Sequence, residues 1–222
     1  TRTEQPVGGG GDMNPQDLQL SLVTDPTLCR EFGVVETVME AVAGGATSVQ
    51  LRDKEASDEV LILQARDLMK FLKPMRIPLL INDRVEVARA VAAQGIHVGR
   101  EDMPVEEVRQ RVGPDMWIGF SVESPEAALK VDPFVVNYAG VGPVFSTGTK
   151  PDHLPPVGVE GLRRLVTSLP VPSIAIGGIG AHHGAELMKT GVEGVAVVSA
   201  ICGQPNPREA TRQLRQAMEE QS

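Results

Sequence analysis

Short apolar runs alternate with amphipathic helical patterns along almost the whole chain, and this alternation limits the fold more than any other feature. The apolar runs lie at 18–23, 48–51, 79–81, 96–98, 117–119, 134–138, 173–176 and 194–198. The helical patterns lie at 34–43, 58–72, 85–93, 105–112, 125–129, 161–168, 184–189 and 207–218. Strands that alternate with helices form parallel pairs through right-handed crossovers. Eight such pairs predict an α/β protein whose strands close into one (β/α)8 TIM barrel, rather than an open doubly wound sheet.

The composition agrees with strands that are buried on both faces. Hydrophobic residues make up 41% of the 222 residues but aromatic residues only 3%, so the core must consist of Val, Ile, Leu and Ala. A chain of this length forms a single domain of this class. Residues 1–16 contain four consecutive glycines and no periodicity, so we expect a flexible extension there and the barrel over 17–222.

The charge balance narrows the range of partners. A formal net charge of -8 and a pI near 5.1 argue against nucleic acid or an anionic membrane, because both need concentrated positive charge. The sequence shows neither a membrane-span pattern nor a signal-peptide pattern. Cys29 and Cys202 lack neighbours at zinc-site spacing and predict reduced, packed thiols. We expect a soluble, cytoplasmic protein that acts on small molecules; assembly into a homo-oligomer stays open.

Polar clusters directly follow the predicted strands. They are QLRDK at 50–54, NDR at 82–84, RED at 100–102, Ser121, TGTK at 147–150, GGIG at 177–180 and Ser199. In a barrel of this class, the carboxyl ends of all strands meet on the face that carries the active site. We therefore expect one site built from all the clusters. The irregular segment 140–160, rich in Gly, Pro and Thr, is the predicted lid over that site.

The cluster after the second strand is a candidate anion site. Strand alternation puts Gln50 and Arg52 on the same side, towards the barrel mouth, with Lys54 close behind. The alternative is a solvated charged loop in which Arg52 pairs with Asp53 or Glu55.

Two aspartates after the third and fourth strands are candidate magnesium ligands. Asp83 with Glu86 also fits an N-cap and capping box for the next helix, and Asp102, before Pro104, also fits a pre-helical turn. Mg²⁺ takes one or two carboxylates and fills its other positions with water and phosphate oxygens. Because adjacent strands bring Asp83 and Asp102 together, a shared metal site is the competing hypothesis.

The glycine turn 177–180 and Ser199 follow the last two strands, where barrels of this class bind phosphate through backbone N–H groups. The alternative is a tight turn that merely needs glycine. His182 and His183 are expected to begin the following helix rather than to act as ligands.

Two further polar residues lie in or after central strands. His97 is flanked by apolar strand residues, which is typical of a buried histidine with satisfied nitrogens. Ser121 has no neighbouring His or carboxylate arrangement that would make it a nucleophile, so we expect it to form hydrogen bonds.

Taken together, these motifs resemble the thiamine-phosphate synthase family over 20–201. The matching motifs are LVTD at 22–25, GGAT at 44–47, QLRDK at 50–54, INDR at 81–84, HVG and ED within 97–102, GPVFSTGTK at 142–150, IGGI at 176–179 and VVSAI at 197–201. Their order and spacing carry the resemblance, since any one of them alone would be weak.

The resemblance implies a reaction: hydroxymethylpyrimidine diphosphate joins a thiazole phosphate, releasing pyrophosphate and forming thiamine monophosphate. It implies that Mg²⁺ is bound by Asp83 and Asp102. The implied diphosphate ligands are Arg52, Lys54, Asn82 and Lys150; those on the pyrimidine side are Gln50 and Ser121; those of the thiazole phosphate are Thr147, Thr149, Gly178, Val198 and Ser199. The catalytic roles would fall to Arg52, Lys54, Lys150 and Ser121.

Two positions depart from the family pattern, and two other functions compete. Arg100 stands where glutamine is usual and Glu123 where histidine is common, which affects substrate affinity more than reaction type. A thiazole tautomerase-like isomerase would bind thiazole phosphate without needing a metal or a diphosphate clamp. A non-enzymatic thiamine-phosphate sensor would keep the phosphate site but need an output surface.

Overall fold

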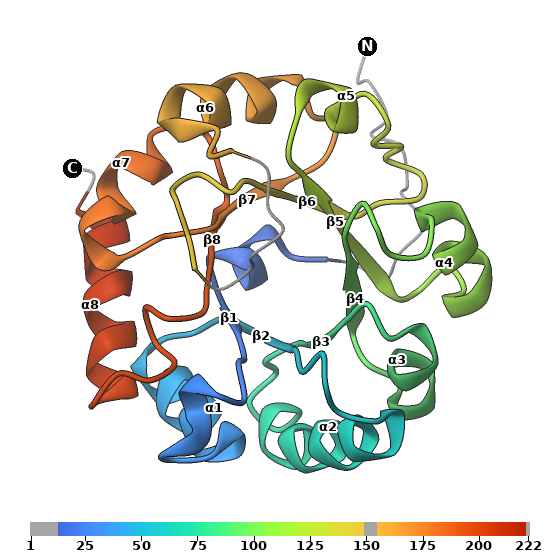
Figure 1. Cartoon of the computed structure of the whole chain (residues 1–222), viewed down its shortest axis with the longest axis vertical. Coiled ribbons are helices and arrows are strands. Elements are labelled where there is room, and N and C mark those ends of the chain that lie inside the picture. The colour runs from blue at the N-terminus through green and yellow to red at the C-terminus, as the bar shows by residue number, and fades with distance from the viewer. Residues whose placement is uncertain (1–12, 149–154, 221–222) are drawn as a thin grey trace.

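Eight parallel strands form a closed barrel in the computed structural model, which describes residues 13–148 and 155–220. The strands are β1 (Leu20–Val23), β2 (Ser48–Leu51), β3 (Leu79–Asn82), β4 (Gly95–Val98), β5 (Trp117–Val122), β6 (Tyr138–Val141), β7 (Ser173–Ile176) and β8 (Gly194–Val197). Each strand pairs with its neighbours in sequence, and β1 pairs with β8, with Ser21 opposite Ala196. The predicted (β/α)8 barrel is confirmed (Figure 1).

The helices surround the barrel on its outside (Figure 1). They are α1 (Val34–Gly44), α2 (Asp58–Leu72), α3 (Val85–Val91), α4 (Val105–Val112), α5 (Pro125–Ala128), α6 (Gly158–Ser168), α7 (Gly184–Met188) and α8 (Pro207–Glu219). Three short 3-10 helices are η1 (Pro15–Leu18), η2 (Leu28–Arg30) and η3 (Ala181–His183). Within the described part of the chain, none of the helices combines the length and the apolar character needed to cross a membrane.

The core has two parts because strand side chains alternate between two faces. Outward strand residues such as Leu22, Val49 and Ile81 pack against the helices in the larger cluster, which consists mostly of Val, Leu, Ile and Ala. The smaller cluster fills the barrel interior and contains Leu18, Val23, Leu80, Tyr138, Ile174 and Ala196. The aliphatic core predicted from the composition is confirmed.

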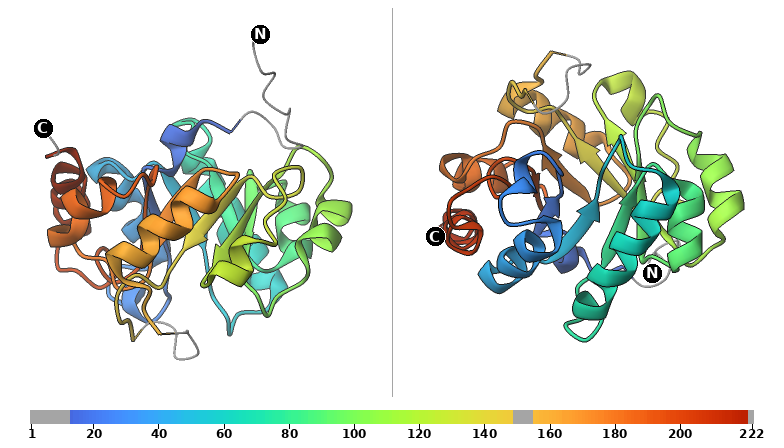
Figure 2. Two further views of the ribbon diagram at one scale, coloured as in Figure 1. Left: turned by 90° about the horizontal axis from the view of Figure 1, so that it is seen from above. Right: turned by 60° about the horizontal axis from the view of Figure 1, so that its bottom comes forward.

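The amino end of the barrel is closed by η1, which Figure 2 shows at the opposite end from the loops that follow the strands. The Asn14 side chain caps this turn by accepting from the Gln16 backbone N–H, and Leu18 enters the barrel interior. The first strand therefore begins at Leu20, not at residue 18 as the apolar run suggested. Of the predicted extension over 1–16, residues 1–12 lie outside the described residues, while Pro15 and Gln16 belong to η1.

The sixth strand differs from its prediction at 134–138. Asp132 folds the preceding segment into a turn: its carboxylate accepts from Phe134 N at 2.9 Å, and its carbonyl accepts from Val135 N and Val136 N at 3.0 and 2.8 Å. The Phe134 side chain is 61% exposed. The strand starts only at Tyr138, because the run of apolar residues is divided between this turn and the barrel.

Candidate active site

Four inward-facing polar residues form a buried layer at the carboxyl ends of β2 to β5. Gln50, Asn82, His97 and Ser121 are each at most 9% exposed. Asn82 Nδ2 donates to Gln50 Oε1 at 3.1 Å, and His97 Nε2 lies 3.0 Å from Ser121 Oγ. This arrangement follows from alternation, since the intervening residues face the helices. The layer lies on one half of the barrel, whereas β1, β7 and β8 contribute apolar residues such as Val23, Ile176 and Ala196.

Both ring nitrogens of His97 form hydrogen bonds. Its Nδ1 lies 2.9 Å from the Tyr138 hydroxyl, and burial raises the pKa of Tyr138, so that the phenol stays protonated. Gly119 makes room for this contact, because a Cβ there would lie 2.2 Å from the Tyr138 ring. The prediction of a satisfied buried histidine is confirmed, but His97 also lines the cavity described below, which the sequence reasoning missed.

Asp83 lies in a cluster of charges just beyond β3. Its carboxylate forms an ion pair with Lys54, and its other oxygen lies 3.4 Å from Arg84 Nε. Its backbone is left-handed, with φ 51°, and its N–H donates to His97 O. The predicted capping box is wrong: Arg84 occupies the N-cap position of α3 without a side-chain cap, and Glu86 pairs with Arg89 instead. The left-handed turn directs the Asp83 carboxylate across to the β2 loop.

Two hydrogen bonds between the Arg52 backbone and Thr24 fix the position of Arg52. Its N–H donates to Thr24 Oγ1 at 3.0 Å, and the Thr24 hydroxyl donates to Arg52 O at 3.3 Å. The predicted alternative, pairing with Asp53 or Glu55, is not observed, because the Asp53 carboxylate accepts from the N–H groups of Glu55 and Ala56. Arg52 Nε is buried without a hydrogen-bond partner among the described residues. A buried donor of this kind needs a partner, and an anion would provide one.

Asp102 closes the loop after β4. Its Oδ2 accepts from Gly99 N at 2.7 Å, as a pre-helical turn predicts. A Cβ on Gly99 would lie 3.3 Å from that oxygen and 4.0 Å from Ser121 Oγ, so the ends of β4 and β5 converge here. Across residues 13–148 and 155–220 there is no group of three or more His, Cys, Asp or Glu side chains able to hold a metal. A cation between Asp83 and Asp102 would therefore need oxygens from a substrate.

The glycine turn after β7 is locked against the loop that follows β6. Gly177 and Gly178 have φ of 91° and 67°, and a Cβ on Gly178 would lie 2.6 Å from Ser146 O. Phe145 N donates to Gly177 O at 3.1 Å. Both the conformation and the close approach require glycine. The sequence analysis gave a tight turn that needs glycine as the alternative to a phosphate site. That tight turn is present, and it also forms part of a cavity wall.

The residues after this turn form η3 and then α7, as predicted for His182 and His183. His183 Nδ1 accepts from Gly180 N at 3.1 Å, and its ring stacks on Phe145 with centroids 3.8 Å apart. Burial and the neighbouring His182 lower the pKa of His183. His183 thus holds the turn in place.

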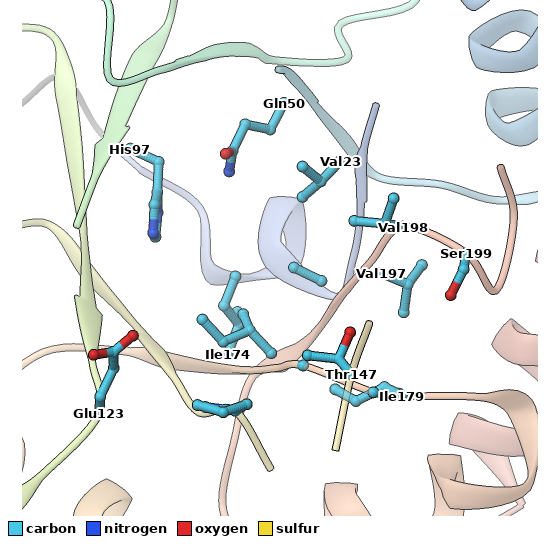
Figure 3. A pocket seen from close by; sticks show the side chains of 15 residues that line it. Val23, Gln50, His97, Glu123, Thr147, Ile174, Ile179, Val197, Val198 and Ser199 are labelled. Carbon is cyan, nitrogen blue, oxygen red and sulfur yellow. The ribbon is translucent and has the colours of Figure 1, made fainter. Parts of the chain in front are cut away.

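A cavity opens between these elements (Figure 3). Its wall consists of Val23, Gln50, His97, Glu123, Pro143, Thr147, Ile174, Ile176, Gly177, Gly178, Ile179, Ala196, Val197, Val198 and Ser199. A second hollow, of about 650 Å³, adjoins it and shares Thr147, Gly178, Ile179 and Ser199. The predicted residues Gln50, Thr147, Gly178, Val198 and Ser199 therefore meet around one space.

The other predicted residues have different positions. Arg52, Lys54, Asn82, Asp83, Asp102 and Ser121 lie at the same end of the barrel but do not line this cavity. Asn82 joins the two groups through its hydrogen bond to Gln50. Thr149 and Lys150 lie outside the described residues, as does the middle of the predicted lid. Glu123, which the sequence indicated only as a departure from the family pattern, is part of the cavity wall. Its position two residues after Ser121 could have predicted that it faces the same side as Ser121.

The closed barrel and the cavity at the carboxyl ends of its strands define the class, an enzyme of the (β/α)8-barrel type. The family model described as thiamine monophosphate synthase matches residues 20–201. Thiamine-phosphate synthase from Azorhizobium caulinodans is 46% identical over 206 residues, covering 93% of this chain and 97% of the relative. The one from Albidiferax ferrireducens is 43% identical over 208 residues, covering 94% and 95%.

A solved structure agrees with these relatives. Thiamine phosphate pyrophosphorylase from Pyrococcus furiosus superimposes with a TM-score of 0.84 at 39% identity, covering 93% of this chain and 98% of that one. The chain belongs to the thiamine monophosphate synthase family, and it is an enzyme of the transferase class.

Proposed function

We propose that this protein condenses hydroxymethylpyrimidine diphosphate with a thiazole phosphate to give thiamine monophosphate and pyrophosphate. The observation that carries this proposal is the buried Arg52 Nε, which lacks a hydrogen-bond partner among the described residues. The protein has a net negative charge, so it needs local positive charge to bind a phosphate-bearing substrate. The Arg52 guanidinium, with an unused donor at the carboxyl end of the barrel, can provide it. The similarity to named thiamine-phosphate synthases supports the same reaction.

The diphosphate would bind beyond β2 and β3. Arg52 and Lys54 supply positive charge, and Asn82 supplies an amide close to Gln50. The Lys54 side chain is 45% exposed and therefore has room to move from Asp83 to an incoming phosphate. Lys150 is proposed as a further cationic ligand from the sequence alone.

Magnesium fits this donor set. Asp83 and Asp102 follow neighbouring strands, and Asp102 Oδ2 is engaged by Gly99 N, which leaves its other oxygen available. Two carboxylates and substrate oxygens match the preference of Mg²⁺. When bound, Mg²⁺ would act as a Lewis acid that stabilises the charge developing on the leaving diphosphate.

The thiazole phosphate would bind at the opposite side of the cavity. Thr147, Gly178 and Ser199 line both the inner cavity and the adjoining hollow. Backbone N–H groups of a glycine turn are well suited to phosphate. Val198 gives this side an apolar surface for a ring.

The reaction needs positioning and charge stabilisation rather than a covalent nucleophile. The carbon–oxygen bond to the diphosphate breaks, its electron pair leaves with the diphosphate, and the thiazole nitrogen donates its lone pair to form the new carbon–nitrogen bond. Arg52 and Lys54 stabilise the negative charge that accumulates on the leaving group. Ser121, held by His97, would orient the pyrimidine beside Gln50.

The test is to incubate the purified protein with both substrates and to measure pyrophosphate release and thiamine monophosphate, with Mg²⁺ or with excess chelator. We expect product only with Mg²⁺, and a loss of turnover of about 100-fold in Asp83→Asn, the size expected when one stabilising charge contact is removed. Glu101→Gln is the matched control, because that carboxylate is 84% exposed and, among the described residues, pairs with Arg100 alone.

Two results would contradict the proposal. Product formed equally well in chelator and by Asp83→Asn would remove the metal-assisted mechanism. Binding of thiazole phosphate without any condensation would favour the tautomerase-like isomerase or the sensor instead. An assay for thiazole isomerisation then separates these two functions.

A further inference from the structure

Glu123 carries the one carboxylate among the described residues that line the cavity. Among the described lining residues there is no Lys, Arg or Asp; the rest are apolar, glycine or neutral polar residues, together with His97. Glu123 is half-buried, and within the described part of the chain it forms no ion pair or hydrogen bond. A half-buried carboxylate that lines a cavity and has no counter-charge there is free to pair with a positively charged group of a ligand.

The position of Glu123 is well defined by its neighbours. Val122, which precedes it, is buried at the end of β5, and Ser124, which follows it, caps α5 by accepting from Ala127 N at 3.2 Å. Figure 3 shows Glu123 on the same side of the cavity as His97, with Thr147 and Ser199 across from it. The carboxylate therefore faces the space between the two ends of the site.

Charged groups of both signs lie around this space. Arg52, Lys54 and Arg84 follow β2 and β3 together with the Asp83 carboxylate, which pairs with Lys54, whereas Glu123 follows β5 and has no such counter-charge among the described residues. A ligand whose phosphate binds at the glycine turn would place its ring between that turn and Glu123. The electrostatic field at the ring would then favour positive charge.

We propose that Glu123 is a specificity-determining residue that recognises the positively charged thiazolium ring. The proposal rests on the proposed function. In that reaction the thiazole nitrogen gives its lone pair to the new carbon–nitrogen bond, so the neutral ring of the substrate becomes a permanent cation in the product. A carboxylate beside the ring stabilises this cation, and its forming charge in the transition state, more than it stabilises the neutral ring.

The test compares two ligands that share the thiazole ring and its phosphate but differ in ring charge and in the pyrimidine, which only thiamine monophosphate carries. Isothermal titration calorimetry measures the Kd of thiamine monophosphate, whose thiazolium ring is positively charged, and of thiazole phosphate, whose ring is neutral, for the wild type and for Glu123→Gln. We expect Glu123→Gln to weaken thiamine monophosphate binding about tenfold, the range of a close charge pair, and to change thiazole phosphate binding less than about twofold. Glu123→Asp keeps the charge and should retain most of the preference for the cation.

Glu126→Gln is the matched control, because Glu126 lies three residues away on the exposed side of α5 and should leave both Kd values unchanged. Equal weakening of both ligands in Glu123→Gln, or no weakening of either, overturns the inference while the proposed function stands. If the wild type binds neither ligand, the proposed function fails, and the inference fails with it. Circular dichroism verifies that each variant is folded.

Discussion

Gly178 shows how one residue can serve both the fold and the site. Its φ of 67° lies in the left-handed region, and a Cβ would lie 2.6 Å from Ser146 O and 2.9 Å from Phe145 C. Two physical constraints therefore require glycine here: backbone conformation and close approach of the loop after β6. The same residue lines both hollows of the candidate site.

We expect Gly178→Ala to raise the Kd for thiazole phosphate at least tenfold and to lower the free energy of unfolding by about 1–3 kcal/mol. The reason is that the alanine Cβ must push the 145–146 backbone away from the turn. Gly158→Ala is the control, because Gly158 has the same φ of 67° with no atom within 4 Å. Titration calorimetry and urea unfolding measure the two effects. Equal losses in both variants would show that strain alone matters.

The residue scale also shows where local patterns mislead. Asp83 followed three positions later by Glu86 is a good capping box in sequence terms, yet the Asp83 carboxylate pairs with Lys54 from another loop. A capping pattern describes only neighbours along one helix. The competing partner is 29 residues away and becomes available only when β2 and β3 lie side by side.

At the scale of elements, one side chain joins α4 to the segment before β6. The Arg109 guanidinium donates to the carbonyls of Val135, Gly113 and Met116, with shortest distances of 2.7–2.8 Å, and to Asn137 Oδ1 at 2.8 Å. Burial lowers the pKa of Arg109. These hydrogen bonds hold the segment around Val135 and Asn137 in its non-strand conformation. The apolar pattern had predicted a strand there.

We expect Arg109→Lys to lower the free energy of unfolding by about 2 kcal/mol, because an ammonium cannot reach all of these acceptors and leaves partly buried carbonyls without partners. Arg111→Lys, on the same helix, is the control. Arg111 is exposed and pairs with Glu107, so its replacement should cost about 0.5 kcal/mol or less. Urea titration followed by circular dichroism compares the two. Similar costs would mean that Arg109 is only a surface contact.

At the scale of the whole molecule, closure of the barrel depends on the seam between β8 and β1. Gly194 begins β8, and a Cβ there would lie 2.2 Å from both Leu18 O and Gln19 O. Because these atoms are backbone, no side-chain rotation can relieve the contact. The seam also brings the two ends of the domain together, so that Val23 and Ser199 both line the cavity.

We therefore predict that Gly194→Ala lowers the free energy of unfolding by about 3 kcal/mol or prevents closure altogether. Gly148→Ala, at a position with no atom within 4 Å, should change it by less than about 0.5 kcal/mol. Urea unfolding and native-state hydrogen exchange at β1 and β8 are the measurements. Unchanged stability in Gly194→Ala would mean that the η1 segment can shift without opening the seam.

The sequence by itself determined the number and order of the elements, because the apolar periods of 2 and 3.6 residues are local properties of strands and helices. Alternation also predicted that Gln50 and the end-of-strand clusters share one face. Only the tertiary structure decided the rest. It paired Asp83 with Lys54 and left Arg52 Nε without a partner among the described residues. It also brought His97 and Glu123 to the cavity wall. These outcomes depend on distances between residues far apart in the chain, which no local pattern records.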